Sequence, residues 1–225
     1  MKLRERIYGY PWRGYGNNCN TYLLVGEKKV LVDPGHVVNE FRENCLDTLQ
    51  KQLEKDGFSL DDVDMVLCTH GHPDHYESAS TVREKSGARV AIFKEEESLL
   101  DAMARMFRER RGDDAPDLTP DILIEEGELE VGDITLEVIH TPGHSPGSTC
   151  FYFADEKTLI TGDTIFRGSI GRTDLPGGDM GAMKDSVNKL AQMEDVELLL
   201  TGHMEHVEGV EEIKRNFSSI KNFFF

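Results

Sequence analysis

Histidine and aspartate side chains stand in short, separate groups along this chain, in a pattern that indicates metal binding. The densest group contains His70, His72, Asp74 and His75. Imidazole nitrogens bind zinc, iron and copper, and a carboxylate adds an oxygen ligand that can bridge two ions. Packing does not explain such a group, because each buried polar side chain would need its own hydrogen-bond partner. These residues are therefore predicted to bind metal directly.

Three more candidate ligands each follow a predicted strand. His144 closes a Thr-Pro-Gly-His sequence, Asp163 a Thr-Gly-Asp sequence, and His203 a Thr-Gly-His sequence. Strands that end on one rim of a sheet can bring such distant side chains into one cleft. An ordinary structural role is favoured for three further histidines, which are His36, His140 and His206. For His140, a hydrogen bond to a ligand is the alternative.

Short apolar runs, broken by glycine and proline, predict the elements that must position these groups. Strands are expected over residues 20–25, 29–32, 63–68, 89–93, 149–153, 158–161 and 196–200, with a hairpin over 128–139. Helices are expected over residues 40–55, from the residues after His75 to Ser86, and over 95–111, 182–191 and 210–224. Residues 112–120 form a predicted connector, and 162–179 a long glycine-rich loop of the kind that carries function. This mixture favours two sheets packed together and covered by helices.

The composition describes a globular protein with a strongly acidic balance. Of 225 residues, 38% are hydrophobic and 30% are charged, and the formal net charge is −17. An acidic surface repels phosphate backbones, so nucleic acid is not expected as a partner. No apolar run reaches the length of a membrane span, no secretory signal is seen, and the four cysteines form no CxxC pair. Free thiols and a cytoplasmic location, away from membranes, are therefore expected.

Taken in order, these motifs resemble those of the metallo-β-lactamase superfamily. The matching sequences are His-x-His-x-Asp-His at residues 70–75, Thr-Pro-Gly-His144, Gly-Asp163 and Gly-His203. They span roughly residues 20–205 of the chain. The resemblance implies an α+β fold, a four-layer αββα sandwich.

The resemblance also implies two metal ions with a defined ligand set. The first ion would be held by His70, His72 and His144. The second would be held by Asp74, His75 and His203. Asp163 would bridge the two ions, and Asp33, after an early strand, looks like a residue that orients a ligand without touching metal.

One stretch narrows the resemblance within the superfamily. Residues 166–179 look like the glyoxalase II-like branch, hydroxyacylglutathione hydrolases that cleave thioesters such as S-D-lactoylglutathione. The same stretch resembles persulfide dioxygenases, which use one iron, so an iron-dependent sulfur dioxygenase is an alternative. A lactone or ester hydrolase and a non-catalytic metal-binding protein are two further alternatives. Asp163, where several true β-lactamases have cysteine, disfavours antibiotic hydrolysis, and His72 in place of glutamate disfavours the flavodiiron branch.

The chain departs from the glyoxalase II pattern in three places. It ends before the C-terminal helical domain that grips glutathione in those enzymes, so a single domain over residues 1–225 is expected. Residues 76–78 read Tyr-Glu-Ser where the family often has a small or apolar residue and two glycines. Residues 204–206 read Met-Glu-His where it often has Gly-Pro or Glu-Tyr. Glutathione specificity is therefore left open, while the metal chemistry is expected to be kept.

The expected activity is hydrolysis of a small acyl substrate, such as a thioester, by two divalent metal ions. Zinc is the first candidate metal, with iron and manganese as alternatives. Asp74 is the carboxylate expected to orient the nucleophile or handle its proton. Arg167 and Arg172 are candidate binders of a substrate carboxylate, although Arg172 equally suits an ion pair with Asp174 or Asp179. The apolar face of the last helix is expected to pack on the sandwich or on a second subunit, which leaves a homodimer open.

Overall fold

Two six-stranded sheets pack face to face in the computed structural model, which describes residues 1–112 and 115–225. The first sheet has the order β1-β2-β3-β4-β5-β6, with β1 (Ile7–Tyr10), β2 (Thr21–Val25), β3 (Lys29–Val32), β4 (Met65–Cys68), β5 (Arg89–Phe93) and β6 (Ile122–Ile124). The second has the order β14-β13-β10-β9-β8-β7, with β7 (Gly127–Val131), β8 (Ile134–His140), β9 (Thr149–Phe153), β10 (Thr158–Gly162), β13 (Leu198–Thr201) and β14 (Val207–Glu208). A separate ribbon pairs β11 (Ile165–Phe166) with β12 (Ser169–Ile170).

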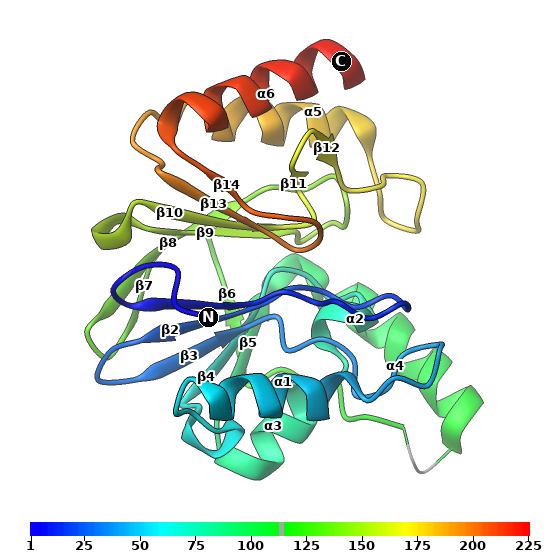
Figure 1. Cartoon of the computed structure of the whole chain (residues 1–225). Coiled ribbons are helices and arrows are strands. Elements are labelled where there is room, and N and C mark those ends of the chain that lie inside the picture. The colour runs from blue at the N-terminus through cyan, green and yellow to red at the C-terminus, as the bar shows by residue number, and fades with distance from the viewer. Residues whose placement is uncertain (113–114) are drawn as a thin grey trace.

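Helices cover the outer face of each sheet, which makes four layers (Figure 1). The first sheet carries α1 (Cys45–Lys55) and α3 (Ala79–Ser86), with α2 (Pro73–Tyr76) and α4 (Glu97–Arg111) beside them. The second sheet carries α5 (Met180–Leu190) and α6 (Val210–Phe224). The order helix, sheet, sheet, helix is the αββα sandwich that the sequence motifs imply.

Apolar side chains fill all three spaces between these layers. Strands buried on both faces read as continuous apolar runs, as Val66-Leu67-Cys68 does in β4. Leu67 packs between the sheets with Phe151, whereas Val66 faces the cluster under α1 and α3. The third cluster holds the buried face of α6, including Phe217, against the second sheet. Of the two expected positions for this helix face, the structure shows packing on the sandwich.

Parallel pairing explains why distant residues meet at one rim. In the first sheet β3 pairs with β4 in parallel, so Asp33 and Thr69, which follow these strands, are neighbours. In the second sheet β10 pairs with β13 in parallel, so Asp163 lies beside the loop of His203. The Thr149 amide donates to the Thr69 carbonyl at 2.9 Å and joins the two rims.

Several elements differ from their predicted bounds for local reasons. The helix expected from residue 40 begins at Cys45, because Asn39 Oδ1 accepts from the Phe41 and Glu43 amides and forms a turn that competes with the helix. The predicted loop over 162–179 contains the β11–β12 ribbon. Strands β1, β6 and β14 lie outside the predicted elements. Of the connector predicted over 112–120, residues 113–114 lie outside the described residues.

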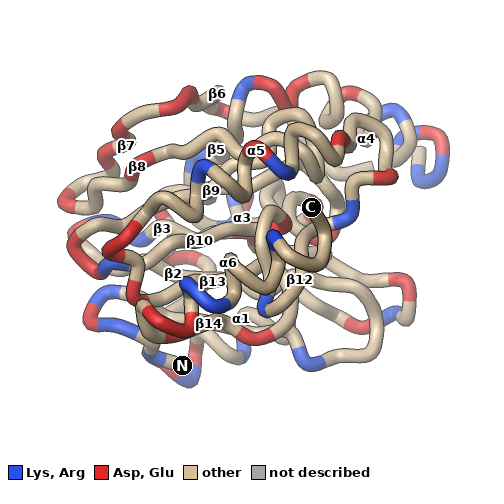
Figure 2. Tube along the Cα trace, turned by 90° about the horizontal axis from the view of Figure 1, so that it is seen from above, with Lys and Arg blue, Asp and Glu red and all other residues tan. Residues whose placement is uncertain are grey.

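Charged residues interleave over the loops and helix surfaces, and acidic ones gather on the β7–β8 hairpin (Figure 2). Glu128 and Glu130 are exposed on β7, the last strand of its sheet. Charges on an edge strand oppose pairing with another chain. Among the described residues, no helix combines the length and apolarity needed to cross a membrane.

The four cysteine thiols are free, as the sequence predicts, and each is buried. They are Cys19, Cys45, Cys68 and Cys150. Burial raises the pKa of every one of them, to about 11 for Cys45 and Cys150 and well above the usual value for the other two.

Candidate metal centre

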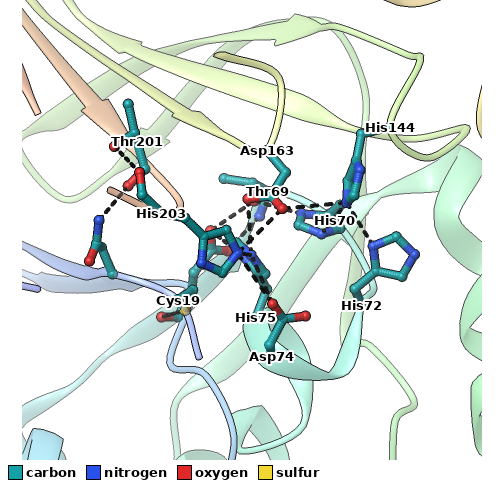
Figure 3. Close-up of polar contacts among 12 residues, drawn as sticks. Cys19, Thr69, His70, His72, Asp74, His75, His144, Asp163, Thr201 and His203 are labelled. Carbon is teal, nitrogen blue, oxygen red and sulfur yellow. Dashed lines mark hydrogen bonds and ion pairs between the residues drawn. The ribbon is translucent and has the colours of Figure 1, made fainter. Parts of the chain in front are cut away.

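All of the predicted metal ligands meet at the rim where strands of both sheets end (Figure 3). The segment after β4 carries His70 and His72 and turns into α2, which begins at Pro73. Asp74 and His75 stand on that short helix. The remaining ligands follow β8, β10 and β13, and they are His144, Asp163 and His203. The structure therefore brings together every residue of the predicted ligand set.

His70, His72 and His144 form a first cluster, with all three side chains buried. His72 Nδ1 lies 2.8 Å from His144 Nε2, which lies 3.2 Å from His70 Nε2. Nitrogen ligands on a tetrahedral zinc ion stand about 3.3 Å apart when each bond is about 2.0–2.1 Å long. The two distances are close to this spacing, and all three nitrogens lie within 4.8 Å of one another, so they can bind one such ion.

Asp74, His75 and His203 form a second cluster beside the first. His203 Nε2 lies 3.3 Å from His75 Nε2 and 3.3 Å from Asp74 Oδ2. His75 Nε2 and Asp74 Oδ2 are 3.8 Å apart. These distances also fit three ligands of one ion.

Asp163 lies between the clusters. Its Oδ1 is 3.2 Å from His75 Nε2, and its Oδ2 is 3.4 Å from His203 Nε2 and 3.5 Å from His144 Nε2. Oδ1 is buried and has no hydrogen-bond donor of good geometry among the described residues. Gly202 permits this approach, because a Cβ there would lie 2.3 Å from Asp163 Oδ1. A buried carboxylate that has one unsatisfied oxygen and reaches nitrogens of both clusters is what a bridging ligand requires.

The outer nitrogens of three histidines reveal where their protons lie. His144 Nδ1 donates to the Arg172 carbonyl at 2.7 Å, and His75 Nδ1 donates to Asp33 Oδ2 at 2.9 Å. Thr69 gives its hydroxyl proton to Asp33, so its oxygen accepts from His70 Nδ1 at 3.1 Å. A neutral imidazole with its proton on Nδ1 presents a lone pair at Nε2. The facing lone pairs of His70 and His144 would repel each other unless a cation stood between them.

The charges of the two clusters differ. Burial, together with neighbouring imidazoles, lowers the pKa of His70 well below its usual value and that of His72 to about 4, so both are neutral, as metal ligands must be. Burial also lowers the pKa of His203, but Asp163 outweighs it and raises the value to about 9. Burial raises the pKa of Asp163, yet His75 and His203 hold it well below the usual range. The carboxylates of the second cluster therefore favour protonated imidazoles at His75 and His203, and a metal ion would have to displace those protons.

Asp33 fixes two of the ligand histidines through hydrogen bonds on the side away from the metal-binding nitrogens. Its carboxylate accepts from the Thr69 amide and hydroxyl, both at 2.8 Å, and from His75 Nδ1. One buried carboxylate thus orients His75 directly and His70 through Thr69. These contacts are those expected of a residue that orients ligands without touching metal.

Glu96 ties two ligand loops together, and no sequence argument singled it out. This fully buried carboxylate accepts from the Gly71 amide at 2.8 Å, the Gly147 amide at 2.6 Å and the Ser145 hydroxyl at 2.5 Å. Gly71 separates two ligand histidines, and Ser145 follows His144. A Cβ at Gly71 would lie 2.9 Å from Glu96 Oε2. In the sequence, Glu96 is hidden in the acidic run 95–97, directly after a strand that ends at the same rim.

Replacing Glu96 by alanine should weaken metal binding by roughly 10–100-fold and lower the free energy of unfolding by about 3 kcal/mol. The cause is the loss of one acceptor shared by three buried donors. Competition with a chromophoric chelator measures the affinity, and denaturant titration the stability. Glu96→Gln keeps one acceptor oxygen, so its metal affinity and stability should lie between those of the wild type and of Glu96→Ala. The variant Glu95→Ala, at an exposed neighbour, is the control. Unchanged metal affinity in Glu96→Ala would disprove the positioning role.

The two arginines proposed for substrate binding lie in different surroundings. Arg172 lines the cleft above the metal clusters, which has a volume of about 580 Å³. Its guanidinium forms a two-point ion pair with Asp174, at 2.7 and 2.9 Å, as the alternative reading predicts. Arg167 lines a second cavity instead, and it donates to the His206 carbonyl.

The three histidines given a structural role belong to none of the metal-binding groups found among the described residues. His36 pairs with the buried Glu77 at 2.5 Å. His140 stacks on Phe93 and bonds the Pro146 carbonyl, so it holds the His144 loop without bonding the ligand itself.

A model of the metallo-β-lactamase superfamily matches residues 14–203, which include every candidate ligand. The chain belongs to the metallo-β-lactamase superfamily. Two relatives align over most of both chains. The probable metallo-hydrolase YqgX of Bacillus subtilis is 35% identical, over 88% of this chain and 90% of that protein. The hydroxyacylglutathione hydrolase GloC of Haemophilus influenzae is 28% identical, over 92% of this chain and 94% of that protein.

Two solved structures superpose on most of the sandwich. BLEG-1, a B3 metallo-β-lactamase, superposes with a TM-score of 0.73 and 30% identity, covering 92% of this chain and 95% of its own. TTHA1623 in a di-iron-bound form superposes with a TM-score of 0.69 and 27% identity, covering 90% and 98%. This metallo-β-lactamase family member therefore combines the αββα fold with a histidine and aspartate cluster fit for divalent metal.

Proposed function

We propose that the chain is a dinuclear metal-dependent hydrolase whose substrate is a thioester of the hydroxyacyl-thiol class. The observation that carries this proposal is Asp163, a buried carboxylate within 3.5 Å of ligand nitrogens in both clusters. The likeness to a hydroxyacylglutathione hydrolase across nearly the whole chain supports the substrate class. The likeness to a di-iron-bound structure supports two ions.

Two divalent ions at this site would lower the pKa of a shared water toward neutrality and polarise an acyl carbonyl. The protein's own groups set the geometry for that chemistry. Asp74 lines the cleft, and Asn17 Nδ2 donates to its Oδ2 at 2.9 Å, which fixes the carboxylate. Asp74 is thus placed to orient the nucleophile and hold its proton. A thiolate leaves without strong protonation, so this site needs no separate acid.

Zinc is the metal we propose, because histidine and aspartate ligands at these spacings suit its tetrahedral geometry. The same ligands accept iron and manganese, so metal identity needs measurement. Elemental analysis of protein purified without chelator should approach two ions per chain. A single ion that supplementation does not increase would contradict the dinuclear site.

Anaerobic turnover tests the reaction type. Because a hydrolase takes its oxygen from water, S-D-lactoylglutathione should be cleaved at an unchanged rate in a glove box. Oxygen uptake with glutathione persulfide is the parallel measurement, and a β-lactam and a lactone are the competing hydrolase substrates. Oxygen consumption with persulfide, without anaerobic thioester cleavage at any metal loading, would establish the iron-dependent dioxygenase instead. Cleavage of the β-lactam or the lactone, without cleavage of the thioester, would show that the substrate is not a thioester.

A further inference from the structure

A second cavity of about 540 Å³ lies beside the cleft that holds the metal clusters. Tyr22 and Asn20 line it, and both are buried. Asn20 bonds both sides of the cavity, because its Oδ1 accepts from the Trp12 amide while its Nδ2 donates to the carbonyls of Thr201 and Met204. The Trp12 indole is held by its own loop through a bond from Nε1 to the Gly16 carbonyl at 2.8 Å. The walls are therefore fixed by buried polar contacts.

The two cavities share one lining residue. Met204 lines both and follows the candidate ligand His203. Its backbone has a φ of 65°, a left-handed conformation that the bond from Asn20 to its carbonyl helps to hold. At the turn of the β11–β12 ribbon, Phe166 faces the metal cleft and Arg167 faces the second cavity. A molecule long enough to pass Met204 would occupy both.

The same division occurs in the loop after β1. Trp12 and Arg13 line the second cavity, whereas Asn17 lines the metal cleft and contacts Asp74. This loop, the Met204 loop and the ribbon thus each contribute residues to both cavities.

Two exposed arginines give the second cavity its charge. Arg13 and Arg167 line it, and neither forms an ion pair within the described part of the chain. Glu205 lines it as well, so its side chains carry a surplus of one positive charge, counted as two arginines against one glutamate, while the ammonium of Met1, also at this cavity, is paired with Asp56. In a protein with 42 acidic and 25 basic side chains, most basic groups find an acidic neighbour, so two arginines without an ion pair that line the same cavity form a candidate site for an anion.

We propose that this second cavity binds the anionic thiol carrier of the substrate while the acyl group lies over the metal clusters. The inference rests on the proposed hydrolase function and adds the chemistry of the leaving group. Arg13 and Arg167 would bind a carboxylate or phosphate of the carrier, and the Trp12 ring would cover its chain. The carboxylates of a glutathione-type carrier and the phosphates of a coenzyme A-type carrier share this anionic character, and the test separates them.

Trp12 is the single tryptophan of the chain, so its fluorescence reports the second cavity directly. The probes are S-methylglutathione, S-methyl-coenzyme A and the uncharged S-methyl-N-acetylcysteamine, none of which can be hydrolysed as a thioester. One anionic probe should change the emission saturably, and the uncharged probe should not. Arg13→Gln combined with Arg167→Gln should raise the Kd at least about tenfold, since hydrogen bonds to charged groups are strong. Arg110→Gln, an exposed arginine on α4, is the matched control.

Kinetics with the corresponding thioesters provide the second readout. The double variant should raise KM for the anionic thioester about tenfold or more, with kcat unchanged, and leave the uncharged N-acetylcysteamine thioester unaffected. Equal affinity in the double variant and the wild type, or an anionic competitive inhibitor that leaves Trp12 emission unchanged, would overturn the proposal. Saturable, arginine-dependent binding without hydrolysis of any thioester would keep the cavity assignment and refute the proposed function.

Discussion

Replacing Asp163 by alanine should lower turnover by about a thousandfold or more and reduce metal content at both sites. The reason is its central place, since its two oxygens lie 3.2–3.5 Å from nitrogens of His75, His203 and His144. Removing a ligand of one cluster only, as in His72→Ala or His203→Ala, should affect mainly that cluster. Elemental analysis beside thioester kinetics distinguishes these patterns.

A matched aspartate provides the control for this experiment. Asp185 is exposed on α5, and Asp185→Ala should keep both metal content and turnover. If Asp163→Ala retained two ions and full activity, Asp163 would not be the bridge, and the dinuclear mechanism would lose its main structural support.

Removing the metal with a strong chelator should abolish activity, by about a thousandfold or more, and destabilise the fold. At free metal about a thousandfold above its Kd, binding stabilises the folded state by about 4 kcal/mol, which is lost on stripping. Without the ion, the lone pairs of His70 Nε2 and His144 Nε2, which lie 3.2 Å apart, would repel each other. Zinc added back should restore turnover and thermal stability together. Full activity in protein shown to be metal-free would contradict the proposal.

Rebinding of metal to the stripped protein should strengthen as the pH rises toward 9. Burial lowers the pKa of His203, but Asp163 outweighs that effect and raises the pKa to about 9, so metal must displace this proton at neutral pH. His72, with a pKa of about 4, offers no such competition. Calorimetry in two buffers of different ionisation enthalpy should therefore detect proton release at pH 7. Affinity that is independent of pH between 7 and 9 would contradict this view of the second cluster.

The ligand cluster could be predicted from sequence because its chemistry is local. Histidines and aspartates that each follow a strand need only parallel pairing, such as β3 with β4 and β10 with β13, to share a rim. The apolar runs also predicted most strands and the four layers, because burial on both faces of a sheet leaves a continuous apolar signal.

Features that depend on long-range contacts could not be predicted in this way. Glu96 lies in an acidic run with exposed neighbours. Its role becomes visible only when the loops that contain Gly71 and residues 145–147 donate hydrogen bonds to it. Helix α1 begins later than predicted because Asn39 Oδ1 accepts from the Phe41 and Glu43 amides. Arg167 and Arg172 look alike in the sequence, yet the chain turns one toward a second cavity and pairs the other with Asp174.

The buried cysteines have a practical consequence for an enzyme that releases a thiol. Each turnover would produce a species that exchanges with disulfides, and the attacking form of any thiol is its thiolate. Cys19 and Cys68 are fully enclosed, and burial holds their pKa values well above the usual one. The folded protein should therefore form no mixed disulfide with the oxidised, disulfide form of its product. A chromogenic disulfide reagent added to the reaction should then count product molecules alone, and the enzyme should react with it only after unfolding.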